Sequence, residues 1–328
     1  MVDRLQRAWQ QGGWLSWLLL PLAGLFWAIS ALRRLGYRAG WLRRYRAPVP
    51  VLVVGNITVG GNGKTPAVMA IAQALQARGF KPGLIARGYG AEPGDFPRLV
   101  TRDADPGQVG DEPAMIGRRT GLPMAVGPDR RKAIETLLAN HDIDLVISDD
   151  GLQHYALERD LELVVMDGER RLGNGRLLPA GPLREGAWRL ATVDAVLVNG
   201  GEARAGEWAM TLAVSEPRRL VDEAPRPWSS LAGPVTAAAA IGHPPRFFRT
   251  LARQGLAVQK AFSFADHHGF SAEDFAGIEG PLLMTEKDAV KCRPFAREDW
   301  YYVPVDAQIP DAFFDFIERR IRKRCHGL

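Results

Sequence analysis

The stretch Pro48–Pro66, PVPVLVVGNITVGGNGKTP, constrains the fold of this chain more than any other. Its four consecutive apolar residues, Val51–Val54, predict a strand that is buried on both faces, as in a parallel sheet. A glycine-rich turn follows, and Gly63-Lys64-Thr65 then opens a helical pattern that extends to about Arg78. A strand, a glycine loop and a helix N-terminus in this order predict a phosphate cradle, because glycines let backbone N–H groups approach phosphate oxygens closely.

The loop matches the pattern GxxxxGK[ST] at every position except the first, where Thr58 stands. Gly60 and Gly61 offer the unusual φ angles that a glycine at that position would supply. In this pattern the lysine reaches the β- and γ-phosphates and the following hydroxyl ligates Mg²⁺. A glycine-rich turn that binds nothing is the alternative, and the flanking strand and helix argue against it. The predicted phosphate-binding residues are Thr58, Val59, Gly60, Gly61, Asn62, Gly63, Lys64 and Thr65.

Length and charge narrow the possibilities only moderately. A chain of 328 residues is long enough for two domains, and its net charge of +5 favours an anionic partner. Nucleic acid, lipid and nucleotide all qualify at this level. The two cysteines, Cys292 and Cys325, have no metal-site spacing and are interpreted as free thiols in a reducing compartment.

A long apolar run near the N-terminus predicts attachment to a membrane. No charged residue lies between Ala8 and Leu32, and a helix of this length reaches across a hydrocarbon core of about 30 Å. Arginines crowd the segment after Leu32, so the positive-inside rule keeps the rest of the chain in the cytoplasm. Because arginines follow the run and no cleavage site is evident, a signal peptide is disfavoured. Spanning and lying in the interface, with a kink at Pro21, stay open, and a buried core helix is the alternative.

Paired carboxylates end the apolar segment Asp144–Asp150, DLVISDD. This is the Walker-B pattern, and Asp149 and Asp150 are therefore candidate ligands of Mg²⁺ together with Thr65. A helix-capping role is the alternative for Asp150. In the segment VGDEP, Asp111 either caps the helix that follows or presents its carboxylate to the nucleotide as a proton acceptor or metal partner.

The remaining pattern predicts an α/β protein. Further strands are expected at 82–86, 124–126, 161–166 and 193–198, with helices between them, and Arg130, Arg131 and Lys132 are expected to be mostly solvated. A basic loop rich in glycine and proline covers 170–185. The composition shifts at 217–234, and the strands and helices after it predict a smaller α/β domain. We therefore expect a membrane-associated helix (1–34), a core like that of P-loop NTPases with a parallel sheet (35–225) and a C-terminal α/β domain (226–328).

Asp266, His267 and His268 form a polar cluster in the C-terminal part. No cysteine or regular ligand spacing accompanies them, so the cluster does not predict zinc. A histidine beside a carboxylate is a candidate proton relay, and a structural role is the alternative.

Seven of these segments, taken in order, resemble the tetraacyldisaccharide 4′-kinase family, the lipid A 4′-kinases of Gram-negative bacteria. They run from the strand before the phosphate loop almost to the C-terminus, and the apolar N-terminal segment is also a feature of that family. The segments are GNITVGGNGKTP, ARGYG, GDEP, SDDGLQH, GNGRLLPAGPLRE, DHH and TEKD.

The resemblance implies transfer of the ATP γ-phosphoryl group to the 4′-hydroxyl of a tetraacylated disaccharide 1-phosphate, giving lipid IVA. It implies that Lys64 and Thr65 serve ATP and Mg²⁺, that Asp111 is the catalytic base, and that His267 tunes it. Asp149 and Asp150 would contribute to metal binding, and His154 would contribute to the active site. Arg184 and Glu185 would contribute to phosphate binding or to the domain interface. The implied partners are the lipid disaccharide and the cytoplasmic face of the inner membrane with its anionic headgroups. Nucleic acid is not implied, and the oligomeric state stays open.

Two other classes of function compete with the lipid kinase. One is a membrane-associated P-loop ATPase or GTPase that acts as a regulatory or delivery switch. The other is a nucleotide-binding adaptor without catalysis. A kinase needs a base for its acceptor, whereas a hydrolase needs only to orient water, so the role of Asp111 separates the classes.

Overall fold

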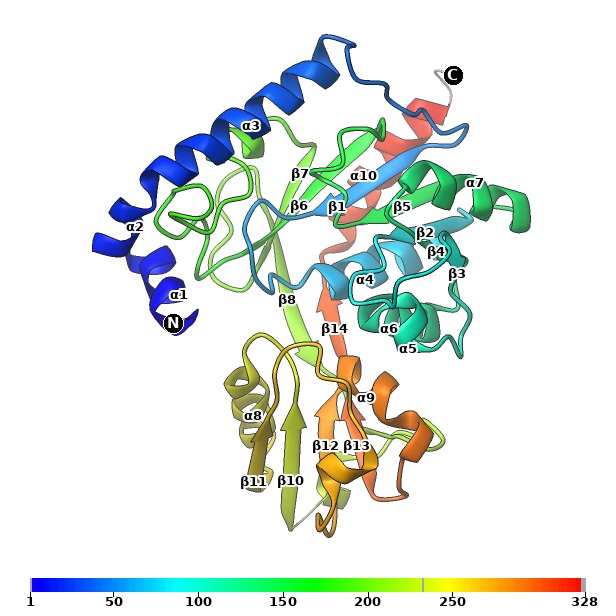
Figure 1. Cartoon of the computed structure of the whole chain (residues 1–328). Helices are drawn as coiled ribbons and strands as arrows, with labels where there is room; N and C mark the ends of the chain where they lie inside the picture. The colour runs from blue at the N-terminus through cyan, green and yellow to red at the C-terminus, as the bar shows by residue number, and fades with distance from the viewer. Residues whose placement is uncertain (1, 232, 326–328) are drawn as a thin grey trace. The chain divides into compact units, whose positions relative to one another are not determined.

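The computed structural model describes residues 2–231 and 233–325 and divides the chain into two compact units (Figure 1). Unit 1 consists of Met1–Arg87, Leu122–Leu212 and Ala307–Leu328. Unit 2 consists of Gly88–Gly121 and Ala213–Asp306. This division differs from the three continuous ranges expected above, 1–34, 35–225 and 226–328, because residues 88–121 group with the later part of the chain.

Unit 1 is built on a parallel sheet with neighbouring strands in the order β8-β7-β6-β1-β5-β2-β4. The predicted strand β1 places Val51 to Val54 in the middle of this sheet, and each of these residues is at most 2% exposed. The strands are β1 (Val51–Gly55), β2 (Pro82–Ala86), β4 (Met124–Val126), β5 (Leu145–Asp149), β6 (Leu161–Asp167), β7 (Ala195–Asn199) and β8 (Trp208–Val214). The predicted parallel α/β fold of this part is confirmed.

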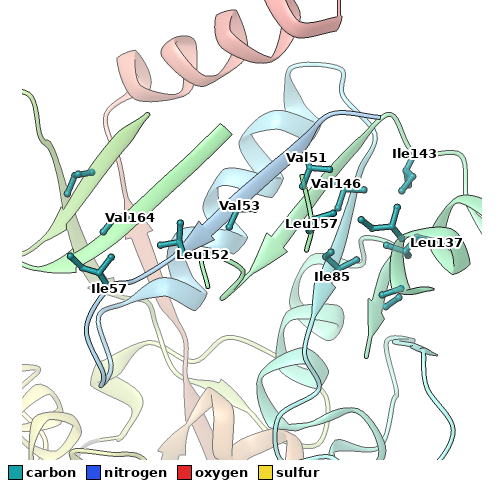
Figure 2. Close-up of a cluster of buried hydrophobic side chains, with 14 of the residues drawn as sticks. Val51, Val53, Ile57, Ile85, Leu137, Ile143, Val146, Leu152, Leu157 and Val164 are labelled. Atoms are coloured by element: carbon teal, nitrogen blue, oxygen red, sulfur yellow. The ribbon is translucent and has the colours of Figure 1, made fainter. Parts of the chain in front are cut away.

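Helices α4 (Lys64–Ala77), α7 (Arg130–Asn140) and α10 (Asp311–Cys325) accompany this sheet. A buried cluster joins residues of β1 to side chains of β2, β5 and α7, and Figure 2 labels Val53, Ile85, Val146 and Leu137 within it. Burial of each such aliphatic side chain contributes roughly 1.5–3 kcal/mol. This core supports the turn that follows β1, which is where the phosphate loop lies.

Unit 2 contains a second sheet in the order β11-β10-β12-β13-β9, parallel except for β9. Its elements in chain order are β3 (Arg98–Leu99), α5 (Pro106–Val109), α6 (Asp111–Thr120), β9 (Arg218–Arg219), η2 (Trp228–Leu231), β10 (Pro234–Ala239), α8 (Pro244–Arg253), β11 (Ala257–Ser263), η3 (Ala272–Phe275), β12 (Leu282–Thr285), α9 (Glu286–Cys292), η4 (Arg293–Phe295) and β13 (Trp300–Val303). The strand β14 (Val305–Gln308) runs across the boundary into unit 1. The helix α9 was not predicted, because it begins directly after β12 with no intervening loop to mark its start. Thr285, the last residue of β12, is its N-cap.

The N-terminal apolar run is broken into α1 (Val2–Gln11), α2 (Trp14–Leu18) and α3 (Leu20–Arg38). Gly12 and Gly13 separate the first two with φ angles of 79° and 130°, which L-residues rarely adopt. Within the part of the chain that the structure describes, no helix is both long and apolar enough to cross a membrane. Along α3, Leu22, Leu25, Ile29 and Leu32 are each more than half exposed, at spacings that place them on one side of the helix.

Candidate active site

The phosphate loop joins β1 to α4 and takes its shape from glycines in left-handed conformations. Gly63 immediately precedes α4 with φ 84°, and Gly60 has φ 103°. A Cβ atom at Gly63 would lie 2.6 Å from the Asn199 amide nitrogen, so only glycine fits there without displacing that side chain. The loop therefore presents the N-terminus of α4, where unpaired N–H groups and the helix dipole favour an anion.

Two buried side-chain amides hold the rest of the loop. The Asn62 amide donates to the Thr58 hydroxyl at 2.8 Å, and the Asn199 amide donates to the Asn62 carbonyl oxygen at 3.1 Å. Thr58 and Asn62 are 5% and 2% exposed. Thr58, the residue that departs from the usual pattern, thus accepts a hydrogen bond that braces the loop. The contact of Asn199, at the end of β7, with the phosphate loop was not predicted, because no motif in the neighbouring sequence indicates it.

Beside this loop, the Asp150 carboxylate lies between the cationic side chains of Lys64 and Arg184. Asp150 follows β5 in a left-handed conformation with φ 49°, and its Oδ1 atom lies 2.6 Å from the Lys64 Nζ atom. The Arg184 guanidinium donates to both Asp150 oxygens, at 3.2 and 3.0 Å. Burial alone would raise the pKa of Asp150, but the charges and hydrogen bonds of Lys64 and Arg184 outweigh it and hold this pKa below its ordinary value. The structure thus brings together Lys64 and Arg184, predicted to bind phosphate, and Asp150, predicted to bind Mg²⁺.

The neighbouring Asp149 ends β5 beside β1 and is 6% exposed. Its backbone oxygen accepts a hydrogen bond from Arg130 at 3.3 Å. Arg130 is 3% exposed, so the prediction that it is solvated is wrong, whereas Arg131 and Lys132 are exposed as predicted. Burial lowers the pKa of Arg130 to about 10, and the charges of Asp149 and Asp150 oppose this shift.

We tested the fit of Mg²⁺ from the chemistry of the donors. The structure shows no cluster of three or more His, Cys, Asp or Glu among its described residues that would hold a metal alone. Thr65, at the start of α4, and Asp149 and Asp150, at the end of β5, offer oxygen donors at the two edges of the loop. Oxygen donors in small number suit Mg²⁺, which is usually bound by one or two carboxylates together with substrate phosphates.

The basic loop at 170–185 lies against the phosphate loop. Arg170 donates to the Gly61 carbonyl oxygen at 2.6 Å and to Asp167 at 2.9 Å. The Val59 N–H donates to the Pro182 carbonyl oxygen at 2.9 Å. Arg170 thus stabilises the phosphate loop through a backbone carbonyl oxygen of that loop. The position of Arg170 in a long basic segment of the sequence did not reveal this contact.

Glu185, predicted to bear on phosphate or on a domain interface, is 2% exposed and lies in a polar cluster of unit 1. Its carboxylate accepts from Gln153 at 3.1 Å and from the Tyr155 hydroxyl, and it lies 3.4 Å from the Arg189 guanidinium. Burial and the charge of Glu185 raise the pKa of Tyr155. Through these contacts, Glu185 belongs to a buried network of hydrogen bonds and ion pairs within unit 1.

The same basic loop is also tied to the N-terminal helices. The Asn174 amide donates to the Ala8 carbonyl oxygen at 3.0 Å and to the Ser16 hydroxyl at 3.1 Å. The Trp9 indole donates to the Pro179 carbonyl oxygen at 2.8 Å. One loop therefore contacts both the N-terminal helices and the phosphate loop.

In unit 2, Asp111 is the first residue of α6, and the N-cap position is taken by Gly110 and not by Asp111. The Asp111 Oδ2 atom lies 3.1 Å from His267 Nδ1 and 3.5 Å from Lys291 Nζ. Gly110 precedes it with φ 95°, and a Cβ atom there would lie 2.5 Å from the Tyr89 carbonyl oxygen. A tight glycine turn thus sets the start of α6 and the position of the carboxylate.

The two adjacent histidines have different surroundings. His267, with φ 63°, contacts Asp111 through Nδ1, while its ring meets the Tyr89 ring edge-on at 5.2 Å. His268 stacks on Phe264 and lies 3.3 Å from Asp274. Of the pair, His267 is the one beside the predicted base, and no zinc-type cluster accompanies it among the described residues.

Two lysines of α9 complete this second site, and the sequence patterns had not singled them out. Lys287 Nζ lies 3.4 Å from His267 Nε2, and Lys291 Nζ lies 3.2 Å from Asp288 Oδ1. The two lysines are four residues apart on one helix, so they share a face. The segment TEKD contains Lys287, but only a recognised helix after β12 would have revealed the pair.

His154, predicted to bear on the site, lies in unit 1 after β5, where burial and the charges of Arg130, Arg159 and Arg33 lower its pKa to about 4. It is therefore neutral at physiological pH. A neutral imidazole near the strand ends can accept or donate a hydrogen bond without adding charge.

Comparisons with known proteins identify the family to which this chain is similar. A family model described as "Tetraacyldisaccharide-1-P 4'-kinase" matches residues 15–322. A tetraacyldisaccharide 4′-kinase of Shewanella amazonensis is 52% identical, over 95% of this chain and 94% of the relative. One of Aeromonas hydrophila is 50% identical, over 97% of this chain and 96% of the relative.

A solved structure resembles the whole chain as well. The apo-form LpxK of Aquifex aeolicus in complex with ATP has a TM-score of 0.80 and 26% identity, covering 94% of this chain and 99% of that one. The expected fold class and the resemblance in seven segments are both confirmed. The chain belongs to the tetraacyldisaccharide-1-phosphate 4′-kinase family.

Proposed function

We propose that this chain transfers the γ-phosphoryl group of ATP to the 4′-hydroxyl of a tetraacyldisaccharide 1-phosphate. The observation that carries the proposal is the Asp111–His267 pair, because a carboxylate oriented by an imidazole is what an alcohol acceptor requires and a simple phosphate-binding module does not. The phosphate loop with Lys64 supplies the other half of the reaction.

On the nucleotide side, the loop from Thr58 to Thr65 binds the triphosphate through backbone N–H groups and the α4 N-terminus. Lys64, paired with Asp150 at 2.6 Å in the free protein, exchanges this partner for phosphate oxygens when ATP binds. Arg184, on the other side of Asp150, is positioned to follow the same exchange. Positioning and charge neutralisation supply most of the acceleration in such a transfer.

The Thr65 hydroxyl and the Asp149 and Asp150 carboxylates would hold Mg²⁺. When bound, the ion would neutralise negative charge on the triphosphate. The protein's own part is to keep both carboxylates at the end of β5 and to hold Thr65 at the start of α4.

On the acceptor side, Asp111 takes the proton of the 4′-hydroxyl as the new O–P bond forms. The bond between the γ-phosphorus and the β–γ bridging oxygen breaks, and ADP leaves with that electron pair. His267 and Lys291 orient the Asp111 carboxylate through its Oδ2 atom, at 3.1 and 3.5 Å.

The acceptor carries acyl chains, so the enzyme works at the cytoplasmic face of the inner membrane. The exposed apolar side of α3, which includes Leu22, Leu25, Ile29 and Leu32, rests among the lipids. Arginines at the end of α3 and after it lie against anionic headgroups, each contributing about 1 kcal/mol near the surface.

The test is transfer of label from [γ-³²P]ATP to the lipid disaccharide in mixed micelles. Label on the lipid that disappears in the Asp111→Ala protein supports the proposal. Inorganic phosphate released at the same rate with and without the lipid identifies an ATPase switch instead. Bound nucleotide with neither product identifies a non-catalytic adaptor.

A further inference from the structure

Lys287 lies on the side of the His267 ring that faces away from Asp111. The imidazole Nδ1 atom is 3.1 Å from Asp111 Oδ2, and its Nε2 atom is 3.4 Å from Lys287 Nζ. Both contacts are made within unit 2, and the Lys287 side chain is 14% exposed. The ring is therefore held between an anion and a cation.

This arrangement decides which ring nitrogen carries the proton. A lysine ammonium can only donate, so Nε2 must be the acceptor of that contact, and a neutral imidazole then carries its proton on Nδ1. The Nδ1 proton points at the Asp111 carboxylate, which accepts it. The opposite tautomer would turn an N–H toward an ammonium and a lone pair toward a carboxylate, which is unfavourable at both ends.

The lysine is itself held in place by acids. Lys287 donates to Asp266 Oδ1 at 3.0 Å and lies 3.9 Å from Glu112 Oε1. Asp266 is a poor alternative partner for the ring, because its Oδ1 atom is 3.9 Å from His267 Nε2, beyond hydrogen-bond distance. The Lys287 ammonium therefore lies nearer to Nε2 than the Asp266 carboxylate does.

We infer that Lys287 is a positioning residue that keeps His267 in the Nδ1–H tautomer, so that His267 serves Asp111 as a hydrogen-bond donor and not as a proton relay. In this tautomer Nδ1 has no lone pair available to take a proton from Asp111. The hydroxyl proton of the acceptor therefore stays on Asp111 until the product leaves. The inference rests on the proposed function, since it assigns Asp111 as the base.

The decisive measurement is made on resting protein, without ATP or lipid. In full-length protein labelled with ¹⁵N-histidine, long-range ¹⁵N–¹H correlation at mildly alkaline pH distinguishes the two tautomers. We expect a protonated nitrogen at Nδ1 and an unprotonated one at Nε2, with the His267 signals identified by their loss in His267→Ala. An Nε2–H pattern in the unaltered protein would overturn the inference whether or not the chain is a kinase.

Substitution of Lys287 provides a second test of the inference. Lys287→Met removes the ammonium, and we expect the His267 signals to shift toward the Nε2–H tautomer while kcat falls on the order of tenfold and the ATP KM changes less than about twofold. Lys287→Arg restores a donor and should keep the Nδ1–H pattern. Lys260→Met, at an exposed lysine of β11, is the control. An unchanged tautomer in a folded Lys287→Met protein would refute the role of Lys287.

Discussion

The nucleotide side and the acceptor side of the proposed reaction are constructed differently. The phosphate side in unit 1 consists of a loop between adjacent elements, shaped by Gly60 and Gly63 and presenting backbone N–H groups. The acceptor side in unit 2 consists of side chains from distant segments, with Asp111 and His267 separated by 156 positions. The backbone conformation of the phosphate loop is specified by a short stretch of sequence. The contact between Asp111 and His267, in contrast, depends on the whole fold of unit 2. Substitutions should therefore affect nucleotide binding and turnover separately.

The sharpest test of this comparison is Asp111→Ala. Loss of a general base should lower kcat by roughly 10²- to 10⁴-fold, because the alanine side chain cannot accept the hydroxyl proton. ATP affinity, measured by calorimetry or nucleotide fluorescence, should stay within about twofold. Glu279→Ala, at an exposed acid of the same unit, is the control. A large loss of ATP affinity would show that Asp111 belongs to the nucleotide side.

Lys64→Ala should give the opposite pattern. The loop loses the lysine that we propose to contact the phosphates, so ATP binding should weaken and kcat/KM should fall by about 10²- to 10³-fold. Lys132→Ala, at an exposed lysine of unit 1, should leave both values unchanged. Full ATP affinity in the Lys64→Ala protein would mean that the cradle binds through its backbone alone.

His154 makes the stability of the protein pH-dependent. Its pKa, about 4 in the folded protein and 6.5 in the ordinary case, means that the unfolded chain binds a proton more readily. Stability is therefore unaffected by this group above pH 6.5 and is lost as the pH falls from 6.5 to 4. In denaturant unfolding at a series of pH values, His154→Gln should show a shallower decline. Parallel curves for the two proteins would contradict the assignment.

The smallest expected effect concerns the contact between the basic loop and the N-terminal helices. Asn174→Ala leaves the Ala8 and Ala180 carbonyl oxygens without that donor, which should lower the unfolding free energy by about 1–2 kcal/mol. Because the same loop contacts the phosphate loop, ATP affinity should also fall slightly. Asn140→Ala, at an exposed helix end, is the comparison. An unchanged melting temperature would show that the loop is held by its other contacts.

The contrast between the two halves also explains what could be predicted. The strand Val51–Val54, the glycine turn and the DLVISDD segment are local patterns, and β1, α4 and β5 appeared where these patterns indicated. The parallel sheet followed from them because buried strands alternate with helices. The roles of Asp111 and His267, by contrast, came from resemblance to a family, since no spacing links residues so far apart.

The errors have physical causes as well. Arg130 was expected to be solvated because charged residues usually are, but it turns inward to bond Asp149 and Gly127 at the strand ends. Asn199, Arg170 and Lys287 act through contacts with residues distant in the sequence, and such contacts leave no periodic pattern. The N-terminal apolar run was interpreted as one helix, and two consecutive glycines with positive φ divide it.

The chain passes between its two units four times, after Arg87, Gly121, Leu212 and Asp306. A truncation that keeps only the residues after 225 would consequently retain His267 and Lys287 but lose the helix that bears Asp111. Dissection of this enzyme for separate expression should instead join 88–121 to 213–306 through a short linker. A soluble fragment of that composition would carry an intact histidine–aspartate contact, detectable by the same nitrogen resonances, with no nucleotide-binding half attached.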